Sequence, residues 1–399
     1  MPYPASRRLK CVRCRGGAPL NKISKDVLSN GMHIFLCVRG NSAIVVIALI
    51  LQLVSCEWLT HPSLEQYSAL QRTPSPMSKD ALHIRFFGTT TLQVDDGQTA
   101  IMIDGFFSRP SVSRLALSYI APNLASIGPN QKRIVTALNR GNVTNLAAVL
   151  VSHSHYDHAL DSAFVACRTN AVLVGSQSTA NIARGQGLPE VQIFTPAVNQ
   201  TLRFGKFLVD VFDSLHSLPP RFQGTINEVL APPASVNDYK EGGTYSFLIR
   251  HEWGTILIHS SAHFIPEMFR GVHADVVFLS IGSLGKQQKD FASRYWREVV
   301  GATEPALVVP IHWDDFFRPL DYPLIPMPFF GDKFTSGMDM VLEMANASNI
   351  RLELLPPFEA FDIKKSEVRT RRQKKLEGRP EKLFETAVDP MTSCHSAPE

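Results

Sequence analysis

A cluster of three histidines and one aspartate constrains this chain more than any other feature. The cluster is His153-Ser154-His155-Tyr156-Asp157-His158, which directly follows the apolar run 147–152. Four metal-type ligands packed at the end of a buried strand would desolvate and repel one another without a cation. In an extended loop, residues i and i+2 project to the same side, so His153 and His155 can share one ion. Asp157 and His158 can face a second ion, and these ligand types suit zinc.

The segments around this cluster alternate between strand-like and helix-like patterns. Two early strands, HIRFFGTTTLQV and TAIMIDGFF, are joined by an Asp95-Asp96-Gly97 turn. A buried strand at 171–175 follows the cluster, and the residues between the two are expected to be helical. Further strands are expected at 201–212, 245–251, 255–259, 275–280 and 306–311. Early hairpins followed by strands that alternate with helices favour an α/β fold in which helices cover sheets.

The spacing HxHxDH resembles that of the metallo-β-lactamase superfamily. The similarity covers residues 82–356 and includes FFGTTTLQVDDGQTAIMIDGFF, with Asp104 at the end of the second strand. It also includes AAVLVSHSHYDHALD, the strand that ends at Leu215-His216, GGTYSFLIRHEWGTILIHSSAHF and VVPIHWDDF. The resemblance implies an αββα four-layer sandwich, with metals held at one edge of the two sheets.

The resemblance also implies two sets of metal ligands. The first set consists of His153, His155 and His216, and the second consists of Asp157, His158 and His312. One or two zinc ions are expected, although manganese or iron is compatible with the same donors. Bound zinc generates a hydroxide from water at neutral pH, and Asp157 is the expected catalytic residue that orients it and takes up its proton.

One departure from the family pattern lies in the segment His259-Ser260-Ser261-Ala262-His263. The family usually places an aspartate that bridges the two metals here, and Ser261 occupies that position, with Ser260 as the alternative. A neutral hydroxyl is a poorer zinc ligand than a carboxylate, so the second metal is expected to bind weakly or to be absent. His263 is a candidate replacement for the missing bridge.

Substrate selection is expected to depend on two insertions, residues 105–146 and residues 217–243. Both should overhang the metals, and Phe107, Arg221 and Tyr239 are the candidate pocket residues. The expected activity is hydrolysis of an ester, lactone, amide or phosphodiester bond in a small-molecule or lipid-like substrate. The fold alone does not determine which of these is cleaved.

Charge is unevenly distributed along the chain. The formal net charge is +4, yet residues 1–31 carry seven Lys/Arg against one Asp, and residues 364–382 carry nine against three Glu. Each end therefore contributes +6, which leaves −8 for the rest of the chain. An acidic body makes nucleic acid an unfavourable partner. Two alternatives remain open: a nuclease of the same fold that uses the basic tail, and a degenerate metal-binding protein with little activity.

An apolar stretch at residues 43–54 predicts a targeting segment. Its 12 residues are too few to span a bilayer, which requires about 20. Arg39 precedes it, and Leu53-Val54-Ser55-Cys56, which overlaps its end, resembles a bacterial lipoprotein signal with Cys56 as the lipidated residue. This predicts a membrane-anchored or exported protein on the periplasmic side of the cell envelope. A buried core helix and an uncleaved anchor are the alternatives.

These features predict five parts of the chain. Residues 1–31 are a disordered over-extended start or long n-region, 32–55 the signal peptide or hydrophobic anchor, 56–80 a tether, 81–360 the metallo-β-lactamase-like domain, and 361–399 a basic disordered tail. Lipidation at Cys56 would leave Cys167 and Cys394 as free thiols, and no disulfide is predicted.

Overall fold

The computed structural model describes residues 60–74, 78–364 and 383–385. The predicted targeting segment, Cys56 and most of the predicted basic tail lie outside these residues. Among the helices that are described, none combines the length and the apolar character needed to cross a bilayer.

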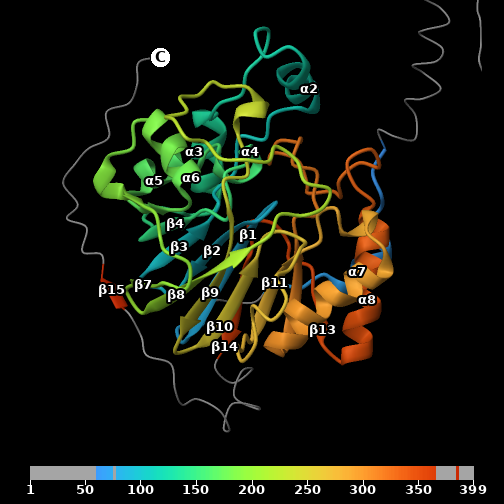
Figure 1. Cartoon of the computed structure of the whole chain (residues 1–399). Helices are drawn as coiled ribbons and strands as arrows, with labels where there is room; N and C mark the ends of the chain where they lie inside the picture. Colours follow the sequence, from blue (N-terminus) through green and yellow to red (C-terminus); the bar gives the residue numbers. More distant parts are fainter. Residues whose placement is uncertain (1–59, 75–77, 365–382, 386–399) are drawn as a thin grey trace, which may run out of the picture. The chain divides into compact units, whose positions relative to one another are not determined.

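Two mixed β-sheets form the centre of the domain (Figure 1). The first has seven strands in the order β14 (Ala360–Lys364), β1 (Ala81–Gly88), β2 (Thr91–Asp95), β3 (Ala100–Ile103), β4 (Ala148–Leu150), β5 (Val172–Val174) and β6 (Ile193–Phe194). The second has eight in the order β13 (Arg351–Leu352), β12 (Leu307–Ile311), β11 (Val276–Ser280), β10 (Gly254–His259), β9 (Thr244–His251), β8 (Phe207–Ser214), β7 (Thr201–Phe204) and β15 (Leu383–Glu385). In each sheet an antiparallel part adjoins a parallel part.

Helices cover the outer faces of both sheets (Figure 1). Those beside the first sheet are α3 (Gln131–Arg140), α4 (Tyr156–Ala159), α5 (Ser162–Thr169) and α6 (Gln177–Gly185), and those beside the second are α7 (Lys289–Trp296) and α8 (Phe334–Ser348). A further helix, α2 (Val112–Ile120), lies in the insertion after β3. The described elements also include four short 3-10 helices, η1 (Glu65–Leu70), η2 (Glu190–Gln192), η3 (Val236–Asp238) and η4 (Leu284–Lys286), and a π-helical segment, η5 (Arg297–Gly301).

The alternation of side chains in β1 shows why these layers form. Leu82, Ile84 and Phe86 lie in the larger apolar core, which contains buried residues of both sheets and of α7 and α8. Phe87 points the other way, into a second core between the first sheet and the helices α3, α5 and α6. Because neighbouring residues of a strand face opposite sides, each sheet can bury both faces. The predicted αββα sandwich is confirmed.

Two predicted strands are each divided by a turn. The first predicted strand becomes β1 and β2, since the chain reverses at Gly88 and Thr89, which have φ angles of +99° and +52°. The segment 201–212 becomes the hairpin β7–β8, with Gly205 at φ +55°. Strand propensity alone could not locate these reversals, because they require left-handed backbone at single residues.

Part of the segment expected to be a tether packs on the domain. The Tyr67 side chain is buried and its hydroxyl donates to Asp339 Oδ1 at 2.6 Å, while Gln71 forms a bridge with Leu354. The start of the predicted tail also belongs to the fold, because β14 extends to Lys364 and β15 pairs with β7.

The prediction of a free thiol at Cys167 is wrong, because this residue is disulfide-bonded. The other five cysteines of the chain all lie outside the described residues. Pairing depends on the distance between Cα atoms in the folded chain, which cysteine spacing in the sequence does not reveal.

Candidate metal centre

Strand ends from both sheets meet at the edge that carries the histidines. The loop 151–155 follows β4, His216 follows β8 by two residues, and His312 directly follows β12. In the folded chain these segments place two groups of ligand-type side chains side by side. His216 and His312, which have no neighbouring ligand in the sequence, each join one of these groups.

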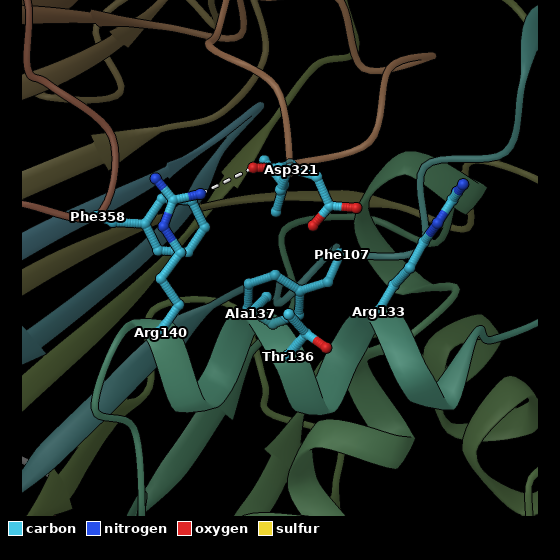
Figure 2. Close-up of a pocket in the computed structure, with 8 residues that line it drawn as sticks. Phe107, Arg133, Thr136, Ala137, Arg140, Asp321 and Phe358 are labelled. Carbon is cyan, nitrogen blue, oxygen red and sulfur yellow. Dashed lines mark hydrogen bonds between the residues drawn. The ribbon is translucent and has the colours of Figure 1, made fainter.

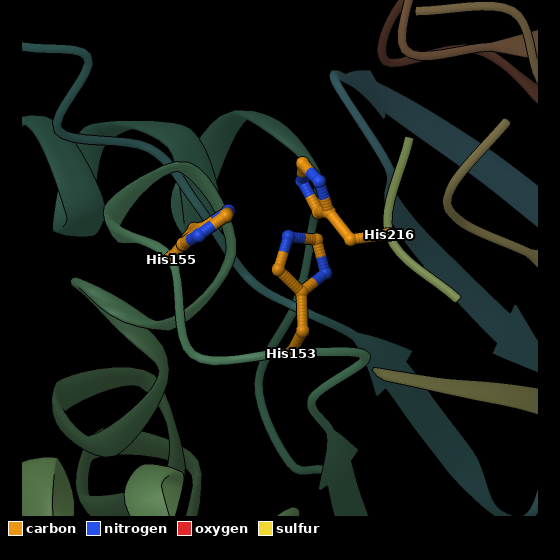
Figure 3. Close-up of side chains that lie close together, drawn as sticks. All are labelled: His153, His155 and His216. Atoms are coloured by element: carbon orange, nitrogen blue, oxygen red, sulfur yellow. The ribbon is translucent and has the colours of Figure 1, made fainter. Parts of the chain in front are cut away.

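His153, His155 and His216 form the first triad. One nitrogen from each ring lies within 4.8 Å of the others, and the ring centroids are 4.6–5.0 Å apart. Figure 3 shows the three rings turned toward one another. The His216 Nδ1 donates to the carbonyl oxygen of Ser217 at 2.9 Å, which orients the ring and leaves Nε2 available.

Asp157, His158 and His312 form the second triad. The Asp157 Oδ2 lies 3.7 Å from His158 Nε2 and 3.5 Å from His312 Nε2. Asp157 and His158 lie in α4, whose N-cap is His155. The two triads adjoin, since the His153 and His158 ring centroids are 3.8 Å apart. The structure therefore brings together all six predicted ligands.

A buried carboxylate, Asp104, orients His158. Its Oδ2 accepts a hydrogen bond from His158 Nδ1 at 2.8 Å and one from the Thr90 hydroxyl, while its Oδ1 accepts from the Ser152 backbone N–H at 2.7 Å. Asp104 directly follows β3 and has a φ angle of +59°. A partner of this kind fixes the tautomer of a ligand histidine, so that Nε2 faces the metal. The sequence signal was an aspartate directly after an apolar strand, but the sequence did not reveal its partner.

A buried ion pair supports His312. The Arg109 Nη2 lies 2.7 Å from Asp314 Oδ2, and both side chains are fully buried. The other oxygen of Asp314 accepts from the Thr89 N–H at 2.6 Å, and the Thr89 carbonyl accepts from the His312 N–H at 2.6 Å. This connection runs from the insertion after β3 to the backbone of a triad residue. The sequence did not reveal this ion pair, because an Arg and an Asp that are 205 positions apart form no local pattern.

The two triads differ in charge. Burial lowers the pKa of His155 to about 4 and that of His216 to about 3, so these imidazoles are neutral at physiological pH. In the second triad, burial alone would raise the pKa of Asp157, but His158 and His312 outweigh it and the pKa is lowered. Burial opposes protonation of His158, yet Asp104 and Asp157 raise its pKa.

The residues of this site fit a metal ion. The Nε2 atoms of His153, His155 and His158 are buried and find no hydrogen-bond partner within the part of the chain that the structure describes, although a buried polar atom normally has one. Each of these atoms belongs to a triad, and the surrounding donors are imidazoles and a carboxylate, which are the ligands of zinc and related metals. The cluster is therefore capable of binding metal.

Ser261 and His263 have different surroundings, and neither belongs to a triad. Ser261 is buried, and its neighbour Ala262 donates through its N–H to Ser217 Oγ at 2.7 Å, next to His216. His263 belongs to neither triad. Its Nδ1 accepts from the Phe264 N–H at 2.7 Å, and its ring packs on Phe291 with centroids 5.3 Å apart.

The three candidate pocket residues occupy different environments. Phe107 and Tyr239 are fully buried in the core beneath the helices of the first sheet. Arg221 is exposed, and the ring of its neighbour Phe222 lies 5.8 Å from that of His155. Of these three, only Arg221 is at the surface beside the triads.

A small pocket lies along α3 (Figure 2). It is lined by Phe107, Arg133, Thr136, Ala137, Arg140, Leu320, Asp321 and Phe358. None of these residues belongs to either triad, so this pocket does not form part of the candidate metal centre.

Known proteins match the region that contains the triads. The family model described as the beta-lactamase superfamily domain matches residues 101–313, which include all six triad residues. Two metal-dependent hydrolases, from Pyrobaculum islandicum and Pyrobaculum arsenaticum, are 25% and 26% identical over 239 residues, covering 59% of this chain and 85% of each relative.

Two solved structures are similar to this chain at low sequence identity. A metallo hydrolase from Ignicoccus hospitalis is 13% identical with a TM-score of 0.45, covering 71% of this chain and 99% of that one. A diiron beta-hydroxylase from Streptomyces venezuelae is 14% identical with a TM-score of 0.45, covering 73% of this chain and 55% of that one. Because the family model accounts for more than half of the sequence, the chain belongs to the metallo-β-lactamase superfamily.

Proposed function

We propose that this protein is a zinc-dependent hydrolase whose reaction takes place where the two triads adjoin. The observation that carries the proposal is that the buried Nε2 atoms of His153, His155 and His158 lack a hydrogen-bond partner among the described residues. Such atoms are costly in a folded protein unless a metal or another partner satisfies them. The names of the Pyrobaculum relatives, metal-dependent hydrolases, support hydrolysis as the reaction class.

The choice of zinc rests on the donor set. Five imidazoles and one carboxylate make up the two triads, and this combination is typical of zinc in hydrolytic sites. Zinc, when bound, supplies a water molecule of lowered pKa and a Lewis acid for a developing negative charge. Manganese and iron use similar ligands, so the identity of the metal is a measurable part of the proposal.

The chain itself supplies the groups that move and balance charge. Asp157 remains ionised, because the neighbouring imidazoles lower the pKa of its carboxyl. It can therefore hold a nucleophilic water by a hydrogen bond and accept its proton. The exposed Arg221 lies on the loop after His216 and is the candidate contact for an acidic group on the substrate. We propose an ester, lactone, amide or phosphodiester as the bond cleaved.

The place of action is a second part of the proposal. A lipid anchor at Cys56 would hold the protein at the periplasmic side of the cell envelope, with a small-molecule or lipid-like substrate. This part rests on the apolar stretch 43–54 and the residues that follow it. The intact mass of the protein from a membrane fraction tests it, because a mature chain that retains residues before Cys56 contradicts lipidation.

The main test is elemental analysis of the purified full chain, followed by a panel of ester, lactone, amide and phosphodiester substrates. We expect one or two zinc ions per chain and turnover in at least one class. His153→Ala should lose metal and activity. His273→Ala is the control, because this half-exposed histidine contacts the Asp275 carboxylate at 3.2 Å and belongs to neither triad. A chain free of transition metal contradicts the proposal.

The same experiment separates the hydrolase from a degenerate metal-binding protein. Tightly held metal without turnover on any substrate class favours the degenerate protein. Ser261→Asp sharpens the distinction, because it restores a carboxylate where the family usually has one. A second metal together with a rise in activity would show that the missing carboxylate limits the site, whereas unchanged metal content and activity would show that the site works without it.

A further inference from the structure

We propose that α2 and the turn after it form a docking surface for an anionic lipid bilayer beside the metal centre. This surface belongs to the folded domain and is separate from the predicted N-terminal targeting segment. The docking does not depend on the proposed hydrolase activity.

The surface consists of large apolar side chains that are unusually exposed. We define the α2 patch as Leu117, Tyr119, Ile120 and Leu124, which are 40%, 58%, 75% and 77% exposed. Single exposed apolar residues are common in proteins, but a contiguous group of them marks an interaction site. Exposures of this size describe side chains that protrude into the solvent rather than line a cavity. A protruding apolar group can enter the boundary between lipid headgroups and acyl chains.

The opposite face of α2 is held firmly on the domain. The Val236 N–H donates to Ser118 Oγ and the Ser235 hydroxyl donates to the Ser118 carbonyl, both at 3.0 Å. The Asn237 side chain donates to the Tyr119 carbonyl at 3.0 Å. Leu115 and Ser118 are the buried residues of the helix. Since η3 secures this face, the α2 patch points outward, and Figure 1 shows α2 at the periphery of the domain beyond α3 and α4.

The charge around the α2 patch favours an anionic partner. Apart from the buried Arg109, whose charge is paired with Asp314, residues 105–156 contain four Arg or Lys and no Asp or Glu, whereas the chain without its two basic ends carries −8. Arg114 and Lys132 are exposed. The neighbouring loop 217–243 contains Arg221 and Lys240 together with three acidic residues. The net charge of the two segments taken together is still positive. Basic side chains around an apolar group are the composition of surfaces that bind anionic lipid.

The α2 patch continues toward the metal centre. The Tyr119 ring centroid lies 6.2 Å from that of Phe222, and the Phe222 centroid lies 5.8 Å from that of His155. A bilayer on the α2 patch would therefore adjoin the first triad through one aromatic side chain. If the proposed function holds, docking places the site next to lipid-phase substrates.

Hydrogen exchange of the full chain tests the docking locally. A local measurement is needed, because the apolar stretch 43–54 could attach the chain to any vesicle. We expect amides of residues 112–124 to exchange severalfold more slowly with vesicles of equal parts phosphatidylcholine and phosphatidylglycerol. Phosphatidylcholine vesicles alone should slow them less, and added salt should reduce the difference. Equal protection by both vesicles contradicts an anionic surface, and no protection at 112–124 contradicts docking altogether.

Charge substitutions identify the residues responsible. Ile120→Glu and Leu124→Glu should abolish the protection of residues 112–124 without changing the unfolding midpoint, because both side chains are exposed. Val191→Glu is the matched control, since Val191 is 66% exposed on η2, and it should keep the protection. Protection that rises with protein concentration in the absence of lipid would instead identify a second copy of the chain as the occupant. Hydrogen-exchange protection can be measured without any turnover. Its result therefore tests the docking surface independently of the proposed hydrolase activity.

Discussion

The first and second triads use the same ligand type but are stabilised differently. The first consists of three imidazoles, of which His155 and His216 have pKa values lowered by burial to about 4 and about 3. The second contains a carboxylate, Asp157, and rests on two further buried carboxylates, Asp104 and Asp314. The first triad is therefore a neutral site, and the second is part of a network of buried charges.

The two triads should therefore lose their metal-binding ability for different reasons. A neutral triad is disturbed mainly when its imidazoles are protonated. A buried charge network is disturbed when one partner is removed, because the remaining charge is left without compensation. Substitutions that separate these two mechanisms test the comparison.

We expect the largest effect from Asp157→Asn. The substitution keeps the shape of the side chain but removes the only carboxylate in the two triads and the proposed proton acceptor. Activity on any substrate found should fall by about 10²- to 10⁴-fold, and metal content should fall while the first triad keeps its ion. Steady-state kinetics and elemental analysis measure both. Unchanged activity would exclude Asp157 as the base.

Arg109→Met should have the next largest effect, on stability. It leaves the fully buried Asp314 without its cation, and breaking a buried pair typically costs about 3–5 kcal/mol. Arg72→Met is the matched control, because the Arg72–Glu353 pair at 2.8 Å is partly exposed and should contribute about 1 kcal/mol or less. Urea unfolding of the two variants measures the difference. Equal losses would contradict a special role for the buried pair.

Asp104→Asn should weaken metal binding with a smaller effect on stability. The amide can no longer accept hydrogen bonds at both oxygens, so His158 loses its fixed tautomer, and such changes reduce metal affinity by about 10- to 100-fold. Asp96→Asn is the control, because Asp96 is also buried and lies 3.3 Å from His251, at the opposite end of β3 from Asp104. Competition with a chelator measures the metal affinity, and equal metal affinities in the two variants would contradict the prediction.

The smallest effect concerns the pH dependence of the metal-free protein. His155 and His216 have lower pKa values in the folded chain than in the unfolded one, so the unfolded chain binds more protons below about pH 6.5. The free energy of unfolding should therefore fall between about pH 7.5 and pH 5.5, by about 1 kcal/mol for each imidazole. Urea unfolding at both pH values checks this. His155→Gln should show a smaller fall, and an identical fall in this variant would assign the effect elsewhere.

Much of the architecture could be predicted from the sequence. The hairpin β9–β10 and the strands β11 and β12 appear where apolar runs and turn residues indicated them. These signals are local, because side-chain alternation and turn chemistry depend on neighbouring residues. The divisions at Gly88 and Gly205 were missed, because they depend on backbone angles at single positions.

The ligand-rich segment 153–158 could be identified from the sequence, because its side chains gather within one stretch of chain. The distant residues that complete and support the site could be identified only in the folded chain. Asp104, Arg109 and Asp314 acquire their roles from contacts across the fold, and the candidate pocket residues Phe107 and Tyr239 lie fully buried in the core. A residue's type shows the chemistry that it can perform, but its partners and its burial are set by how the layers pack.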